Sequence, residues 1–342
     1  MEEKRNFDLL TLGQVLLRLS PPNNDRLVRG DTFVKQVGGA ELNVAVGVAL
    51  LGLRTGVISK LPSHDMGSFM KGKIRSYGVS DDFFMYDDSP SARVGIYYYE
   101  NGAYPRKPKV IYDRANSSFY SLKIDEIPEK AYTASRCFHT SGITLALSPK
   151  VRETAIEMIK RFKAAGTLVS FDVNFRGNLW TGEEAKECIE QILPYVDIFF
   201  CSEDTARLTF KKTGTAREMM KSFTEEYPIS IVASTQRIVH SPKSHTFGSI
   251  IYDARKDIYY EEEPYRDIDV VDRIGSGDAY ISGALYGLLT SNFDCEKAVR
   301  YGNATSAVKN TIPGDLPSSD LEEIETIIKA HNQTGFQSEM AR

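Results

Sequence analysis

The chain has 342 residues, of which 42% are hydrophobic, so it can bury a substantial core in one large domain or two ordinary ones. Lysine and arginine number 42 and aspartate and glutamate 46, and the net charge of -4 comes without a long basic or acidic run. This excludes non-specific binding to nucleic acid or to an anionic membrane. No uncharged apolar run could span a bilayer, and the first residues lack a secretory signal. We expect a cytoplasmic protein with a small-molecule partner, and cysteines that are reduced and buried because they form no CxxC or Cys/His spacing.

Short β-rich runs alternate with longer stretches of helical periodicity, which is typical of a mainly parallel sheet with helices on both faces. The predicted fold class is therefore α/β. In chain order the predicted strands are Leu9–Gly13, Thr55–Ser59, Cys137–Ser141, Thr167–Asp172, Asp197–Cys201, Ser230–Ser234, Ser249–Tyr252 and Asp257–Tyr260. The predicted helices are Ala40–Leu51, Gly67–Tyr77, Pro149–Ala164, Glu183–Leu193, Ala216–Tyr227, Asp278–Leu289, Cys295–Val308 and Ser319–His331.

Two regions break this alternation and are predicted to be short strands joined by loops, without a helix: Leu16–Val37 and Ser91–Asp113. Segments that leave a βα core and pair with each other would form a small sheet beside the C-terminal ends of the main strands, where α/β folds bind ligands. Such a sheet could close over a site as a lid, or it could be a surface hairpin that only covers the core. The last residues, 333–342, are polar without an apolar period and predict a frayed tail.

The strongest local signal is a glycine-rich turn that leads into a predicted helix, Gly275-Ser276-Gly277-Asp278. Backbone N–H groups of the first three residues, at a helix N-terminus, can bind an anion such as a transferring phosphoryl group. The carboxylate of Asp278 would repel a phosphate held for binding alone. It fits a base that accepts the proton of a hydroxyl attacking phosphorus. The alternative is that Asp278 is an ordinary helix N-cap.

A second pair of glycines, Gly38 and Gly39, opens an alanine-rich helix that carries Asn43 one turn in. The glycines would let a ligand reach the backbone, and the amide of Asn43 could donate to and accept from sugar hydroxyls. Helix capping alone is the alternative explanation of this segment.

In order and separation, Gly38–Ala45 and Asp272–Asp278 resemble the paired signatures of the ribokinase-like sugar kinases, the phosphofructokinase-B family. The resemblance covers essentially Phe7–His331. It implies one ribokinase-like domain over residues 1–332, with lid segments at about 14–37 and 91–115. It also implies ATP and magnesium as cofactors, a homodimer formed through the lid, an anion hole at Gly275, Ser276 and Gly277, and Asp278 as the base.

Within the family the chain is most similar to 2-keto-3-deoxygluconate kinases. The matches are Arg18-Leu19-Ser20-Pro21, Leu61-Pro62, Tyr112-Asp113-Arg114, His139-Thr140-Ser141-Gly142-Ile143, Asp172-Val173-Asn174-Phe175-Arg176 and Ile312-Pro313-Gly314-Asp315. A keto-deoxy sugar acid carries a carboxylate that a neutral hexose lacks, so its site should contain arginine. By this resemblance the sugar acid is held by Gly38, Gly39, Asn43, Tyr97, Tyr112, Arg114 and Arg176. For Tyr97, Tyr112, Arg114 and Arg176 the alternative to a binding role is that the arginines lie on the surface and the tyrosines pack the lid.

Phosphorylation of another sugar stays open, namely fructose, ribose or keto-deoxygalactonate. So does a sugar- and nucleotide-binding regulator without turnover, because two sites depart from the usual pattern. Gln14 stands where relatives frequently have glutamate, which removes a charge near the sugar. The usual Asn-x-x-Glu motif is replaced by Ser202-Glu203-Asp204-Thr205, so magnesium would be organised through water by Glu203 or Asp204.

The nucleotide side is also unusual, because Ala233–Arg237 lacks the compact glycine turn of many relatives. The residues that the resemblance assigns to ATP are Ser202, Ser234, Thr235, Arg237, Asn303, Ala307 and Lys309, of which the last three match the adenine pocket. By the same resemblance, Asp272 and carbonyl groups near Gly314 would contribute to a site for a monovalent cation such as K⁺.

Overall fold

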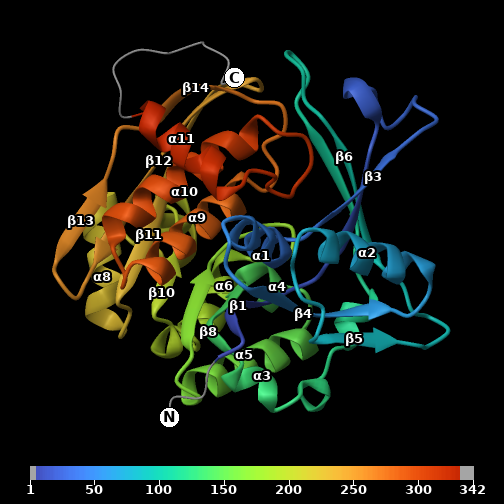
Figure 1. The fold of residues 1–342 in the computed structure, drawn as a ribbon, viewed down its shortest axis with the longest axis horizontal. Coiled ribbons are helices and arrows are strands. Elements are labelled where there is room, and N and C mark those ends of the chain that lie inside the picture. The colour runs from blue at the N-terminus through green and yellow to red at the C-terminus, as the bar shows by residue number, and fades with distance from the viewer. Residues whose placement is uncertain (1–4, 332–342) are drawn as a thin grey trace.

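A computed structural model describes residues 5–331 as an α/β structure in which helices cover both faces of a central sheet (Figure 1). The strands are β1 (Phe7–Leu12), β2 (Leu16–Ser20), β3 (Val34–Gly38), β4 (Thr55–Pro62), β5 (Phe84–Asp87), β6 (Gly95–Glu100), β7 (Lys109–Asp113), β8 (Ser135–Ser141), β9 (Leu168–Asp172), β10 (Ile198–Phe200), β11 (Ile231–Ser241), β12 (Ser244–Asp253), β13 (Ile258–Glu261) and β14 (Tyr265–Asp269). The helices are α1 (Ala40–Leu50), α2 (Asp65–Ser76), α3 (Lys130–Thr133), α4 (Gly142–Ala146), α5 (Pro149–Ala164), α6 (Gly182–Glu190), α7 (Glu203–Phe210), α8 (Ala216–Glu226), α9 (Ser276–Thr290), α10 (Cys295–Asn310) and α11 (Leu321–His331). The predicted α/β class is confirmed.

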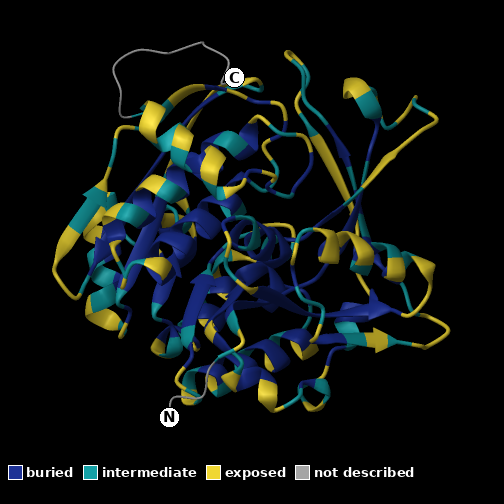
Figure 2. Ribbon diagram, viewed as in Figure 1, coloured by how far each residue is buried: buried dark blue, intermediate teal, exposed yellow. Residues whose placement is uncertain are grey.

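The central sheet has the order β13-β12-β11-β10-β9-β8-β1-β4-β5, and β14 pairs with β12. Strands from β11 to β5 run parallel to their neighbours, whereas β12, β13 and β14 are antiparallel. Successive side chains point to opposite faces. In β10, Phe199 packs among residues of α5, α6 and α8, while Ile198 and Phe200 pack among residues of α1, α9 and α10. Figure 2 shows the resulting buried centre, which explains the near-continuous apolar runs of these strands.

The two regions without helices form the second sheet, with the order β3-β2-β6-β7. Strand β1 ends at Leu12 and β2 begins at Leu16, so this small sheet stands at the C-terminal ends of the parallel strands (Figure 1). Leu16, Tyr97 and Tyr99 form a buried cluster on it, which also packs against Ile274 of the loop before α9. We call this four-stranded sheet the lid sheet.

Strand β11 differs most from its prediction. It does not end at Ser234 but continues to Ser241 and forms a long antiparallel hairpin with β12. The predicted end of this strand at Ser234 is therefore wrong. The β-branched pair Ile238-Val239 favours an extended chain, and the hairpin closes only at Pro242 and Lys243.

The start of α9 also differs, because the helix begins at Ser276 and not at Asp278. Gly275 is its N-cap, with a φ of +80° in the left-handed region that favours glycine. Asp278 therefore lies inside the first turn of α9, and its interpretation as an ordinary N-cap is wrong. Strands β5 and β14 and helices α3, α4 and α7, most of them short, are absent from the prediction.

Cys137, Cys188, Cys201 and Cys295 are free and buried, which confirms the prediction for the cysteines. None of the helices within residues 5–331 has the length and apolar character needed to cross a membrane. The frayed tail predicted at 333–342 lies outside the described residues.

Candidate active site

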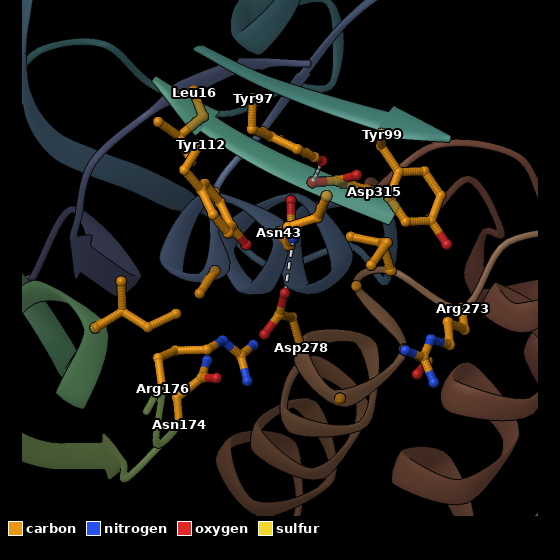
Figure 3. Close-up of a pocket in the computed structure, with 18 of the residues that line it drawn as sticks. Leu16, Asn43, Tyr97, Tyr99, Tyr112, Asn174, Arg176, Arg273, Asp278 and Asp315 are labelled. Carbon is orange, nitrogen blue, oxygen red and sulfur yellow. Dashed lines mark hydrogen bonds between the residues drawn. The ribbon is translucent and has the colours of Figure 1, made fainter. Parts of the chain in front are cut away.

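A cavity of about 450 Å³ lies between the lid sheet and the N-terminal turns of α1 and α9. It brings together residues that the sequence placed in separate segments: Gly39, Asn43, Tyr97, Tyr112, Arg114, Arg176, Arg237, Gly275, Ser276, Gly277 and Asp278. Figure 3 shows Tyr97 and Tyr112 above this space and Asp278 and Arg176 below it. Gly38 lies directly beside it, where an added Cβ would be 2.2 Å from a carboxylate oxygen of Asp315.

Asp278 and Asn43 meet at the centre of the cavity, from the first turns of α9 and α1 (Figure 3). Nδ2 of Asn43 donates a 2.7 Å hydrogen bond to Oδ2 of Asp278. Burial raises the pKa of Asp278 to about 7, while the bond from Asn43 and the positive charge of Arg176 oppose this rise. A pKa near 7 suits a general base that works at neutral pH. Oδ1 of Asn43 is buried without a partner among residues 5–331, so it can accept a hydrogen bond from a ligand.

The N-terminus of α9 has the features of an anion hole. At Gly275 an added Cβ would be 2.1 Å from the carbonyl oxygen of Asp315, whereas at Gly277 it would meet nothing within 4 Å. In the described part of the chain, the N–H groups of these two glycines have no acceptor, while the N–H of Ser276 donates to the carbonyl of Arg273 at 3.3 Å. Unpaired N–H groups and the positive end of the helix dipole therefore face open space, where they can bind a phosphoryl group.

Arg114 lies just after β7 and is held by Gln14. Its Nε donates to Oε1 of Gln14 at 2.8 Å, and Nε2 of Gln14 donates to the carbonyl of Arg114 at 3.2 Å and to Oγ of Ser117 at 2.6 Å. The guanidinium is also 5.5 Å from the centre of the Tyr112 ring. Burial lowers the pKa of Arg114. Because Gln14 is neutral, it positions the guanidinium without cancelling its charge, which stays available to an anionic ligand.

Arg176 follows β9, and its guanidinium points toward Asp278 (Figure 3). Asp172, at the end of β9, is partly buried; burial and the negative charge of Asp278 raise the pKa of Asp172 to about 7, and Arg176 opposes this rise. Asp172, Arg176 and Gly277 also line a second cavity of about 160 Å³. These residues therefore lie at the junction of two cavities, where a group could pass from one ligand to another.

Three residues predicted to bind the nucleotide lie at this second cavity or next to it. Ser202 and Thr235 line it. Ser234 is buried beside them, and its hydroxyl has no partner within residues 5–331. Arg237 is exposed and lines the larger cavity instead.

Four other predicted residues line neither cavity. The carboxylate of Glu203 is paired with Arg207 at 2.7 Å. Asn303 is buried and bonded to Ser249 at 2.7 Å and to Glu262 at 3.0 Å, and Ala307 packs in the core. Lys309 is buried and donates to two backbone carbonyls.

Sequence reasoning missed a buried ionic cluster beneath the lid sheet. Arg18 of β2 pairs with Asp272 and, at 2.7 Å, with Asp315, and the hydroxyl of Tyr97 donates to Asp315. One signal was available, since an arginine between Leu17 and Leu19 in an apolar strand needs buried partners.

Glu41 was missed as well. It is buried at the cavity wall, and its Oε1 accepts from Ser141 at 2.6 Å and from Thr144 at 2.8 Å. Burial raises the pKa of Glu41. It was overlooked because a glutamate in the first turn of a helix usually faces solvent.

Comparison with known proteins gives the family. The model for pfkB family carbohydrate kinases matches residues 6–320. The chain is 34% identical over 322 residues to 2-dehydro-3-deoxygalactonokinase of Haloferax volcanii, covering 94% of this chain and 96% of that protein. It is 27% identical over 330 residues to 5-dehydro-2-deoxygluconokinase of Listeria monocytogenes, covering 95% and 97%. The crystal structure of 2-dehydro-3-deoxygluconokinase from Thermotoga maritima has a TM-score of 0.89 and 32% identity, and the match covers 94% of this chain and 99% of that one. The chain therefore belongs to the pfkB family of carbohydrate kinases.

Proposed function

We propose that this sugar kinase transfers the γ-phosphoryl group of ATP to the terminal primary hydroxyl of 2-keto-3-deoxygluconate (2-dehydro-3-deoxygluconate), giving the 6-phosphate. Similarity to kinases named for two such sugar acids supports the substrate class. The observation that carries the proposal is the buried guanidinium of Arg114, which lines the cavity and is oriented by the neutral side chain of Gln14. Within residues 5–331 no carboxylate forms a direct ion pair with Arg114, and Glu41 at the cavity wall acts on its charge only from a distance. A buried cation without a direct ion-pair partner favours an anionic substrate.

The two ends of the sugar acid then have different partners. Its carboxylate binds Arg114 under the lid sheet, where Tyr97 and Tyr112 enclose it. Its terminal hydroxyl lies at Asp278, which accepts the proton as the hydroxyl oxygen attacks phosphorus. Arg176 contacts the sugar at this end. Its positive charge also helps to neutralise the phosphoryl group that arrives there. Asn43 keeps Asp278 ionised through the 2.7 Å bond and accepts from a sugar hydroxyl with its other oxygen.

The residues of the second cavity suit the phosphates of ATP. The hydroxyls of Ser202 and Thr235 line this cavity and can donate to phosphate oxygens, whereas Ser234 is buried beside it and would reach a phosphate only after a local rearrangement. The N–H groups at Gly275 and Gly277 face the transferring group. Among the described residues no group of three or more His, Cys, Asp or Glu is placed to hold a metal. Magnesium would therefore bind through phosphates and water, with Asp172 nearby and Glu203 in an outer position. When bound, it lowers the negative charge of the phosphates.

We also expect two copies to pair through the lid sheet. Its edge strands β3 and β7 expose Val34 and Ile111 at 47% and 55%, with Phe33 and Val110 beside them. Exposed apolar edges of this kind favour pairing with another chain. Light scattering at micromolar concentration should give the mass of a dimer, and a monomer would contradict this expectation.

A screen of ADP release over sugar acids and neutral sugars tests the function. We expect the highest kcat/KM for 2-keto-3-deoxygluconate and a much lower value for fructose and ribose. A preference for the galactonate epimer would keep the sugar-acid class and correct the configuration, whereas a preference for a neutral sugar would refute the class. Binding of sugar without ADP release in magnesium and ATP would favour the regulator.

The role of Arg114 is tested by Arg114→Ala, with Arg29→Ala on the exposed loop of the lid as the matched control. Loss of a buried charged contact typically costs about 2–4 kcal/mol, or about 30- to 1,000-fold in kcat/KM. We expect this loss for the sugar acid and a much smaller one for fructose. Equal losses for both substrates would mean that Arg114 does not bind the carboxylate of the sugar acid.

A further inference from the structure

Lys309, in the last turn of α10, places its ammonium group in a buried position beside the anion hole. The residue is 1% exposed, and Nζ donates to the carbonyl oxygens of Asp272 at 3.2 Å and Ile312 at 3.1 Å. Within residues 5–331 no carboxylate pairs directly with it. Burying an ammonium group away from water is costly, so a lysine that serves only to fill space would be replaced at little loss by an apolar residue.

The two carbonyl groups belong to the two loops that shape the anion hole. Asp272 begins the loop that ends at the N-cap Gly275, and Ile312 begins the segment that ends at Asp315. The segments touch, since the carbonyl oxygen of Asp315 would be 2.1 Å from a Cβ at Gly275 and the N–H of Gly314 donates to Asp272 at 3.1 Å. The carbonyl oxygens of Asp272 and Ile312 point toward the same position. The ammonium group of Lys309 lies there and bonds to both, so it joins the two loops.

Lys309 offsets the negative charge that the ionic cluster of Arg18, Asp272 and Asp315 leaves. Asp272 and Asp315 share one buried cation, Arg18. Two carboxylates and one guanidinium leave one negative charge, and the ammonium group of Lys309 cancels it. Burial lowers the pKa of Lys309 to about 8 and Arg18 adds to this, while Asp272, Asp315 and Asp278 act in the opposite direction. An uncancelled negative charge at this point would repel a phosphoryl group entering the anion hole.

We propose that Lys309 is a positioning residue for phosphoryl transfer and serves as an internal cation. Its ammonium group binds the carbonyls beside Asp272 and Gly314, where the sequence predicted a monovalent cation. The kinase should then work without added monovalent cations. This proposal rests on the proposed kinase function, and it assigns Lys309 a place outside the adenine pocket.

The wild-type enzyme gives the first test and needs no variant. ADP release is compared at equal ionic strength in about 100 mM tetramethylammonium chloride, sodium chloride and potassium chloride. We expect rates that agree within about twofold, because the large organic ion cannot enter a carbonyl site. Stimulation by potassium of more than about tenfold would overturn the proposal.

Two variants separate the charge from the space that the side chain fills. Lys309→Ala removes the charge and leaves a cavity, while Lys309→Met removes the charge and keeps most of the volume. In tetramethylammonium chloride both should lose at least about tenfold in kcat, with a smaller effect on the KM for the sugar. Potassium or ammonium chloride should restore most of this loss in the alanine variant only. A methionine variant with wild-type kcat, or an alanine variant that neither ion restores, would overturn the proposal.

Melting temperatures give a readout that is independent of turnover. Potassium should raise the melting temperature of Lys309→Ala above its value in tetramethylammonium, but should leave those of the wild type and Lys309→Met unchanged. If no sugar supports ADP release, the proposed function fails while this comparison still decides the role of Lys309. An equal effect of potassium on all three proteins would reject a specific cation site. If neither variant folds, the wild-type comparison of salts decides alone.

Discussion

Replacing Asn43 by alanine should move the acidic limb of the pH–rate profile to higher pH. Asn43 donates its 2.7 Å bond to the ionised form of Asp278, which is the form that accepts a proton. A hydrogen bond to a charged group contributes about 1.5–3 kcal/mol, and about 1.4 kcal/mol corresponds to one pH unit. Its loss should raise the pKa of Asp278 from about 7 by about one to two pH units. Activity requires the ionised form, so it is lost as the pH falls through this higher value.

The assay is kcat/KM from ADP release over about pH 5.5–9.5. A base with a pKa of 7 is about half ionised at pH 7, and one with a pKa of 8 about one-tenth, so the variant should lose about fivefold at pH 7 and progressively less at higher pH. Any lost contact between Asn43 and the sugar lowers the whole profile without moving its midpoint. Asn178→Ala, at an exposed site after β9, is the control. An unchanged midpoint in Asn43→Ala would refute the assignment of Asp278 as the titrating base.

Three further variants test the base, the specificity residue and the buried cluster. Asp278→Asn should lose about 10²–10⁴-fold or more in turnover. The melting temperature of this variant at about pH 8 should match or exceed that of the wild type, because a carboxylate whose pKa is raised on folding lowers stability once it is ionised. Near-normal turnover of the variant would exclude Asp278 as the base. Gln14→Glu should pair with Arg114 and lower kcat/KM for the sugar acid by about tenfold or more but for fructose far less, and an unchanged ratio between the substrates would speak against this pairing. Arg18→Met leaves two buried carboxylates unpaired and should lower the free energy of unfolding in urea by about 3–5 kcal/mol, and a loss under about 1 kcal/mol would contradict this.

Much of the fold was predictable because hydrophobic periodicity is local. The parallel strands are buried on both faces, so their apolar runs stand out, and the helices between them show their own period. The lid sheet was located by the lack of such a period. The end of β11 was missed because its outer half, from Gln236 to His240, is exposed and carries no core pattern.

The site was predictable only where glycine marks the backbone. Gly275 and Gly277 drew attention to Asp278, whereas Lys309 looks like any lysine at the end of a helix. Its burial follows from two loops that converge in space, and neither periodicity nor spacing contains that information. The contact between Asn43 and Asp278 joins positions 235 residues apart, so only the resemblance to a known family brought them together beforehand.

The short connection between β1 and β2 has a consequence for substrate choice. Gln14 lies in it and bonds to Arg114, which follows β7 of the lid sheet, whereas Asp278 belongs to α9 in the body of the protein. In the proposed function, the guanidinium of Arg114 receives the carboxylate of the substrate. Any closure of the lid sheet would therefore change the gap between Arg114 and Asp278, and the proposed function would then select substrates by their length. A shorter acid would contact either Arg114 or Asp278, but not both at once. Only a substrate long enough to span the gap would contact both groups together.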